Sequence, residues 1–189
     1  MAGESEREKG DEAVILAEIN TLKQLDPYIK RARGVVDTMT GHWTAGTYGD
    51  IDHSDYHVVI GHGGKIFITR DFDEAGAHTW MRNTGNLGVA MACCADMGTV
   101  YADGTVTDWG QYPPTREQVE RMAEVVAYLA IGIGIPRHRI RDHHYWACLD
   151  GYGSDRVDVM ALPGTSEYGW DVIMRKAAEN AEKWGLKLP

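Results

Sequence analysis

One stretch, residues 54–71, restricts the fold more clearly than the rest of the sequence. It reads SDYHVVIGHGGKIFITRD, and its two halves are rich in β-branched and aromatic residues. Between them stand His62, Gly63 and Gly64, which suit a tight turn. The pattern predicts a β-hairpin, so the chain contains a β-sheet.

Other strands are expected on both sides of the hairpin. Residues 34–46 combine β-branched residues with flanking glycines and predict a strand that ends near His42. The apolar run at 87–94 predicts a buried strand, and residues 138–144 predict a short one. Residues 95–112 are typical of a surface loop or small hairpin.

Apolar residues at helical spacing predict a first helix over residues 12–31 and a last helix over 169–185. Residues 1–10 are expected to fray, and residues 145–166 show little regular pattern. The residues expected to face inward are Ile15, Ile19, Leu22, Ile173, Ala177, Ala181 and Trp184.

A capping box predicts the start of a middle helix. Thr115 is its N-cap and Gln118 stands three residues later, while Gly132, Gly134 and Pro136 end the helix. Strands and helices are mixed around one sheet, so the predicted class is α/β or α+β, a mixed central β-sheet flanked by helices. The length of 189 residues favours one main domain.

The charge and the apolar runs exclude several classes of partner. With 28 acidic and 19 basic residues, the net charge of −9 argues against nucleic-acid binding. No apolar run is long enough for membrane insertion. The charged N-terminus lacks the apolar segment of a secretory signal, so we expect synthesis in the cytoplasm.

The three cysteines, Cys93, Cys94 and Cys148, are too few for a disulfide framework. Cys93 and Cys94 lie in an apolar run and are expected to be buried free thiols. Cys148 with a nearby histidine could act as a nucleophile, which gives one hypothesis for a hydrolase.

Histidines at predicted strand ends suggest a metal site. His42 and His143 each end a predicted strand, and strand ends of one sheet can face one cleft. A catalytic zinc takes three protein ligands and leaves a fourth position open. The third ligand could be Asp150, Asp155 or Asp158, and spacing alone does not choose among them.

Four blocks of the sequence resemble the zinc N-acetylmuramoyl-L-alanine amidases, whose fold is shared by phage endolysin amidases and peptidoglycan recognition proteins. The blocks read GHWTAG, DYHVVIGHGGKIF, GAHTWMRNTGNLGVAM and DHHYWACLDGYGSDRVDVMALPG, in the order of the family. The resemblance covers roughly residues 34–185 and implies an amidase domain over 34–189, preceded by a charged segment and helix at 1–33. It implies Zn²⁺ as cofactor and peptidoglycan as substrate. The bond cleaved would join the lactyl group of N-acetylmuramic acid to L-alanine.

The resemblance also implies the metal ligands, position by position. His42 matches the first ligand, His143 the second and Asp158 the third. Because Leu162 stands where many members place the ligand before Pro-Gly, the third ligand must come from further upstream, and Asp155 stays open beside Asp158. His144 likewise stays a rival of His143.

The remaining site residues follow in the same way. Tyr56 and Arg156 match the positions that act beside the metal, and His78 and Asn83 match a segment beside the substrate cleft. His57, which follows Tyr56, is expected to pack on the opposite strand face.

Two further questions stay open. A non-catalytic peptidoglycan-binding module could share this fold. Delivery to the cell wall could use a holin, as for a phage endolysin, or a secretion machine, as for an injected effector. The sequence does not predict the oligomeric state.

Overall fold

The computed structural model describes residues 15–153 and 155–189, and within them the strands form one mixed sheet. The sheet has six strands in the order β1-β4-β3-β5-β2-β6. Their bounds are β1 Ala17–Ile19, β2 Thr38–Trp43, β3 Val58–Ile60, β4 Ile66–Ile68, β5 Asn86–Met91 and β6 Ile140–Asp142. The predicted α/β class, a mixed central sheet flanked by helices, is confirmed.

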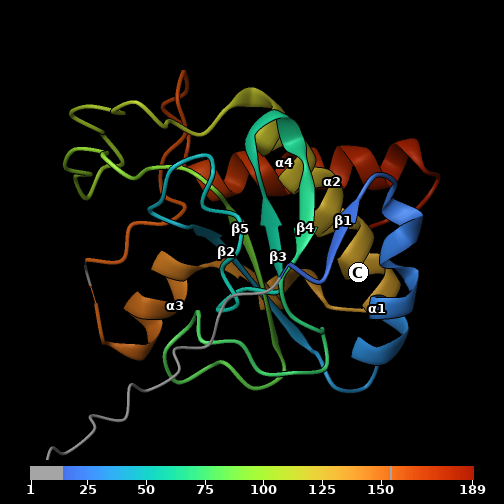
Figure 1. Ribbon diagram of the computed structural model, residues 1–189. Coiled ribbons are helices and arrows are strands. Elements are labelled where there is room, and N and C mark those ends of the chain that lie inside the picture. Colours follow the sequence, from blue (N-terminus) through green and yellow to red (C-terminus); the bar gives the residue numbers. More distant parts are fainter. Residues whose placement is uncertain (1–14, 154) are drawn as a thin grey trace, which may run out of the picture.

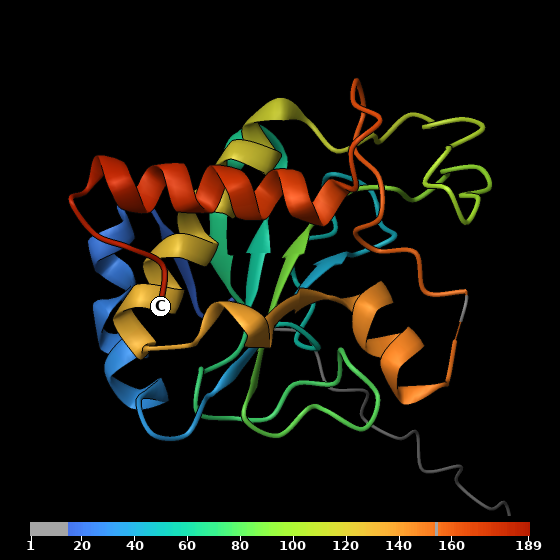
Figure 2. The same cartoon turned by 180° about the vertical axis from the view of Figure 1, so that it is seen from behind.

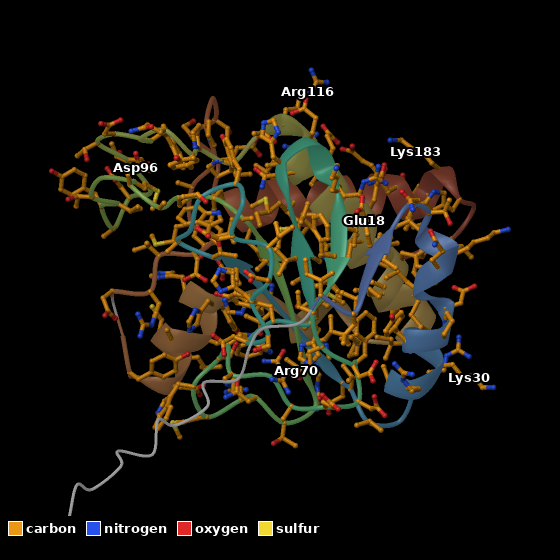
Figure 3. All side chains as sticks on the ribbon, viewed as in Figure 1. Glu18, Lys30, Arg70, Asp96, Arg116 and Lys183 are labelled. Atoms are coloured by element: carbon orange, nitrogen blue, oxygen red, sulfur yellow. The ribbon has the colours of Figure 1, made fainter. Side chains whose placement is uncertain are left out.

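Helices cover the sheet and extend from its edges (Figures 1 and 2). The α-helices are α1 Asp26–Ala32, α2 Arg116–Ile133, α3 His143–Asp150 and α4 Gly169–Lys183. Short 3-10 helices are η1 Leu22–Leu25, η2 His62–Gly64 and η3 Arg137–Arg139. α2 and α4 pack on one another over one sheet face, while α3 lies apart from them beyond the end of β6. Their charged side chains, such as Lys30, Arg116 and Lys183, point outward (Figure 3).

The hairpin and the central strands are confirmed. β3 pairs antiparallel with β4, with Val58 opposite Ile68, and η2 forms the turn between them. β3, β5, β2 and β6 run parallel to one another. β2, β3 and β5 are almost entirely buried, as parallel strands covered on both faces should be.

The predicted helix over 12–31 is wrong in its first half, and its residues before 15 lie outside the described part of the chain, as does the expected fraying of 1–10. Ile19 belongs to β1 and pairs with Ile66 of β4. The free edge of the hairpin provides main-chain partners that outweigh local helical spacing. The helix itself starts at Asp26, where Pro27 suits the first turn. Both elements join the same core, and the division of the chain at residue 33 stays a prediction.

Residues 138–144 form a strand only at β6, and the following residues form α3 rather than irregular structure. His143 and His144 therefore begin a helix. The Asp142 side chain caps this helix by accepting a hydrogen bond from the Tyr145 N–H at 3.0 Å. Gly151, with φ of 72°, ends it. Because the helix has only 8 residues, its short apolar pattern did not predict it.

The middle and last helices are confirmed. Two of the residues expected to face inward are exposed instead, namely Ile15, which precedes β1 and is 39 % exposed, and Trp184. Trp184 follows the end of α4 and is 38 % exposed, because the helix stops at Lys183. Thr115 and Gln118 form the expected capping box of α2. The Gln118 side-chain amide also donates to the carbonyls of Ile60 and Ala92, at 3.1 and 2.8 Å.

Two smaller predictions can also be compared with the structure. Cys93 and Cys94 are buried free thiols, as expected, while Cys148 is exposed. Among the described residues, no helix combines the length and apolarity that crossing a bilayer requires.

Candidate metal centre and cleft

Three side chains from separate segments meet at one point. His42 is the second-last residue of β2, His143 is the first of α3, and Asp158 follows α3 in a loop. Asp158 Oδ2 lies 2.9 Å from His42 Nδ1 and 3.2 Å from His143 Nδ1. One potential ligand atom from each residue lies within 4.8 Å of the others.

Sheet register explains how the two histidines come together. β2 and β6 are parallel neighbours, and Gly41 pairs with Asp142. The residues that follow this pair, His42 and His143, therefore leave the same edge of the sheet side by side. Their ring centroids are 4.8 Å apart.

Asp142 holds the loop that carries Asp158 beside the two histidines. Its carboxylate caps α3 and also accepts hydrogen bonds from the Val159 N–H at 3.3 Å and the Tyr168 hydroxyl at 2.5 Å. The His144 N–H donates to the Asp158 carbonyl at 2.9 Å. The start of α3 and the loop with Asp158 are thus tied together. Sequence reasoning did not select Asp142 or Tyr168, and only a predicted α3 with its N-cap could have pointed to Asp142.

The donor set fits a divalent metal ion such as zinc. Burial lowers the pKa of His42 below its usual value, although Asp158 acts in the opposite direction. Burial would raise the pKa of Asp158, but the adjacent imidazole rings of His143 and His42 lower it to about 2. At neutral pH, His42 is then neutral and Asp158 is ionised. Within the described chain, His143 Nε2 is buried and has no hydrogen-bond partner. Two imidazoles and one carboxylate are a ligand set that catalytic zinc takes in proteins.

The rival ligands point elsewhere. Asp150 forms an ion pair with Arg82, and Asp155 is 76 % exposed at its side chain. His144 Nδ1 lies 2.6 Å from the Arg156 carbonyl, and its Nε2 lies 3.5 Å from Cys148 Sγ. The structure therefore brings His42 and His143 to Asp158 and leaves these rivals outside the cluster.

A cleft opens beside the cluster. The residues that line it are Trp43, Thr44, Ala45, Tyr56, Ala77, His78, Trp80, Asn83, His143, Tyr152, Arg156 and Asp158. Among these described residues there is no cysteine, and Cys148 lies on the exposed side of α3. The exposed Trp80 and Met81 were not selected from the sequence, although Trp80 lines the cleft.

Tyr56 lies just before β3, with its ring centroid 5.1 Å from that of His42. Its hydroxyl lies 3.5 Å from the Trp43 carbonyl, at the limit of a hydrogen bond. Burial raises the pKa of Tyr56 far above its usual value, and the nearby Asp158 adds to this. The hydroxyl is therefore protonated at neutral pH and can donate a hydrogen bond.

The other predicted site residues occupy the walls of the cleft. The Asn83 side chain accepts hydrogen bonds from the N–H groups of His78 and Thr79, at 3.0 and 2.8 Å, and so braces this loop. Arg156 has a half-exposed side chain at the cleft. Contact of His78 and Asn83 with substrate stays a prediction.

His57 is buried and packed, as expected. Its Nδ1 accepts a hydrogen bond from the Gly88 N–H, and its Nε2 donates to the Glu74 carbonyl. Burial lowers the pKa of His57 to about 4, so the ring is neutral at pH 7.

Comparison with known proteins identifies the family. The family model described as N-acetylmuramoyl-L-alanine amidase matches residues 20–159. The chain belongs to this amidase family. Membership makes the protein a hydrolytic amidase and implies peptidoglycan as its substrate.

Solved structures give two further likenesses. The endolysin N-acetylmuramoyl-L-alanine amidase LysCS from Clostridium intestinale URNW is 15 % identical, with a TM-score of 0.49, over 83 % of this amidase and 88 % of that chain. The E90A mutant of PlyL is 13 % identical, with a TM-score of 0.45, over 75 % of this amidase and 84 % of that chain. No curated protein matches the sequence.

Proposed function

We propose that this amidase is a zinc-dependent N-acetylmuramoyl-L-alanine amidase with His42, His143 and Asp158 as metal ligands. The observation that carries the proposal is the convergence of three potential ligand atoms within 4.8 Å of one another beside the cleft. When bound there, Zn²⁺ would supply Lewis acidity that polarises a carbonyl and acidifies a water molecule. The scissile bond is the amide between the lactyl group of N-acetylmuramic acid and L-alanine.

Tyr56 and Arg156 are proposed to assist the reaction from the cleft. Hydrolysis of an amide develops negative charge on the carbonyl oxygen, and donors aimed at that oxygen stabilise it. The protonated Tyr56 hydroxyl, beside His42, can be such a donor. Its raised pKa makes it a poor general base. The Arg156 guanidinium, half-exposed at the cleft, can attract the same charge or a carboxylate of the stem peptide.

Replacing Tyr56 with phenylalanine is expected to lower kcat by about 10²-fold, because one donor to the oxyanion is lost while the ring remains. The measurement is the rate of L-alanine-terminated peptide release from purified peptidoglycan, at saturating zinc. KM and bound zinc are expected to stay within about twofold of the wild type. A Tyr56→Phe variant with unchanged kcat would remove Tyr56 from the reaction.

The proposed function is tested by digesting purified peptidoglycan and weighing the fragments by mass spectrometry. The zinc-loaded protein should release stem peptides that begin at L-alanine. Treatment with a chelator should abolish release, and added Zn²⁺ should restore it. Activity that survives complete removal of metal would contradict zinc dependence.

The same experiment separates the second candidate, a peptidoglycan-binding module without catalysis. Such a module would sediment with peptidoglycan and release no peptide. The complete ligand set favours the enzyme, because loss of a ligand is the expected mark of a binding module. Action at the cell wall, after delivery by a holin or a secretion machine, remains a proposal that follows from the substrate.

A further inference from the structure

The His78 ring lies beside the His42 ring, in a space that Gly76 and Gly88 leave open because they have no side chains. His78 is 6 % exposed, and its ring centroid is 5.1 Å from that of His42. A Cβ atom added at Gly88 or at Gly76 would lie 2.7 Å from His78 Cδ2. Any larger residue at either position would displace the ring. The backbone of this sequence is thus shaped to hold an imidazole against His42.

The hydrogen bonds of His78 determine which of its nitrogens carries the proton. His78 Nε2 lies 3.1 Å from the Asn86 carbonyl oxygen, which can only accept. In the neutral ring the proton therefore lies on Nε2, and Nδ1 has a free lone pair. That Nδ1 lies 3.1 Å from His42 Nε2. The facing nitrogen of His42 must then donate.

Thr79 supports the same assignment. Its hydroxyl lies 2.9 Å from His78 Nδ1 and 3.5 Å from His42 Nε2. It can donate to the first nitrogen while it accepts from the second. Whether the His42 proton points to His78 or to this hydroxyl, it lies on Nε2.

With its proton on Nε2, His42 presents the lone pair of Nδ1 on the other side of the ring. This Nδ1 is the atom that lies 2.9 Å from Asp158 Oδ2. Two lone pairs would repel one another there, and a cation between them would bind both. The hydrogen bonds that run from the Asn86 carbonyl through His78 to His42 thus leave the His42 Nδ1 lone pair available to a metal on the side of Asp158.

We propose that His78 is a positioning residue that fixes the tautomer and the ring orientation of His42 as a metal ligand. This inference rests on the proposed zinc function. It assigns His78 to the metal side of the site, where it acts through His42 rather than on the substrate. Partners that orient ligand histidines commonly change metal affinity by about 10–100-fold when they are removed.

The test compares two substitutions that differ only in the hydrogen bond. His78→Leu fills the space of the ring but removes the acceptor that faces His42 Nε2. His78→Asn places an amide oxygen close to the position of that acceptor, Nδ1. We expect His78→Leu to weaken zinc binding by about 10–100-fold and His78→Asn to stay within about fivefold of the wild type. Zinc affinity is measured by competition with a chromophoric chelator, and folding of each metal-free variant is checked by circular dichroism.

His57→Leu is the matched control, because it removes a second buried imidazole, 5.6 Å from the His78 ring, that touches no proposed ligand. Its zinc affinity should equal that of the wild type. At saturating zinc, His78→Leu should keep the wild-type KM for peptidoglycan fragments.

The outcomes separate this inference from the proposed function. A wild-type protein that binds no zinc refutes both. Normal zinc binding by a folded His78→Leu variant, or a raised KM without a loss of zinc affinity, overturns the inference and leaves the zinc amidase intact. If His78→Leu does not fold, equal loss of zinc affinity in His78→Asn and in His57→Leu overturns it instead.

Discussion

Replacing Asp158 with asparagine is expected to lower kcat/KM on purified peptidoglycan by at least about 10³-fold and to release bound zinc. Asp158 Oδ2 is the atom that both His42 Nδ1 and His143 Nδ1 approach. The amide keeps the shape of the side chain but removes its charge, and metal stabilisation of the transition state contributes several kcal/mol. Activity and zinc content, measured on the same preparation, should fall together.

Asp155→Asn provides the control for this change. Asp155 lies three residues earlier, is largely exposed and was a rival for the same role. Its replacement should leave zinc content and turnover unchanged. Full activity in Asp158→Asn, or loss of zinc in Asp155→Asn, would show that the ligand assignment is wrong.

Replacing Trp170 with alanine is expected to lower the free energy of unfolding by about 3–5 kcal/mol. Trp170, in α4, is 2 % exposed, and its ring occupies the space beside Gly41 in β2. Its Nε1 donates to the Ile140 carbonyl at 3.3 Å. The change leaves a cavity between α4 and the strands that carry the site, and it leaves that carbonyl without its partner. Urea unfolding of the metal-free protein measures the loss.

A double-mutant cycle with Gly41→Ala tests whether this contact is the cause. A methyl group at Gly41 would overlap the Trp170 ring, so Gly41→Ala alone should cost about 1–3 kcal/mol. In the Trp170→Ala background the same methyl group has room and should cost much less. Trp80→Ala, which removes a Trp that is 69 % exposed, should change stability by less than about 1 kcal/mol. Strictly additive costs in the cycle would contradict the contact.

Local sequence signals predicted most of the elements that depend on nearby residues. The hairpin at 54–71 and the helix after Thr115 were predicted because turn glycines and a capping box act within a few positions. Strand β1 was not predicted, because its main-chain hydrogen-bond partners belong to β4, about fifty residues later in the sequence. α3 was not, because a helix of 8 residues has too few turns to show a periodic pattern.

The site could be predicted only in part. Resemblance indicated His42, His143 and Asp158, and the structure brings their potential ligand atoms together. The parallel register of β2 and β6 brings the two histidines together, and the hydrogen bonds of Asp142 and His144 hold the loop of Asp158 beside them. No local sequence pattern contains either feature. Asp142 was not selected because its three hydrogen bonds join segments that are separate in the sequence.

Gln118 has two roles: it belongs to the capping box of α2, and it binds the sheet through its side-chain amide. A glutamate at this position would satisfy the helix start equally well. In this fold it would turn a carboxylate toward the carbonyl oxygens of Ile60 and Ala92, where the amide now donates two hydrogen bonds. The capping box, which normally marks only the start of a helix, therefore also specifies where α2 packs on the sheet. At this position the choice between two equivalent capping residues is made by the tertiary structure.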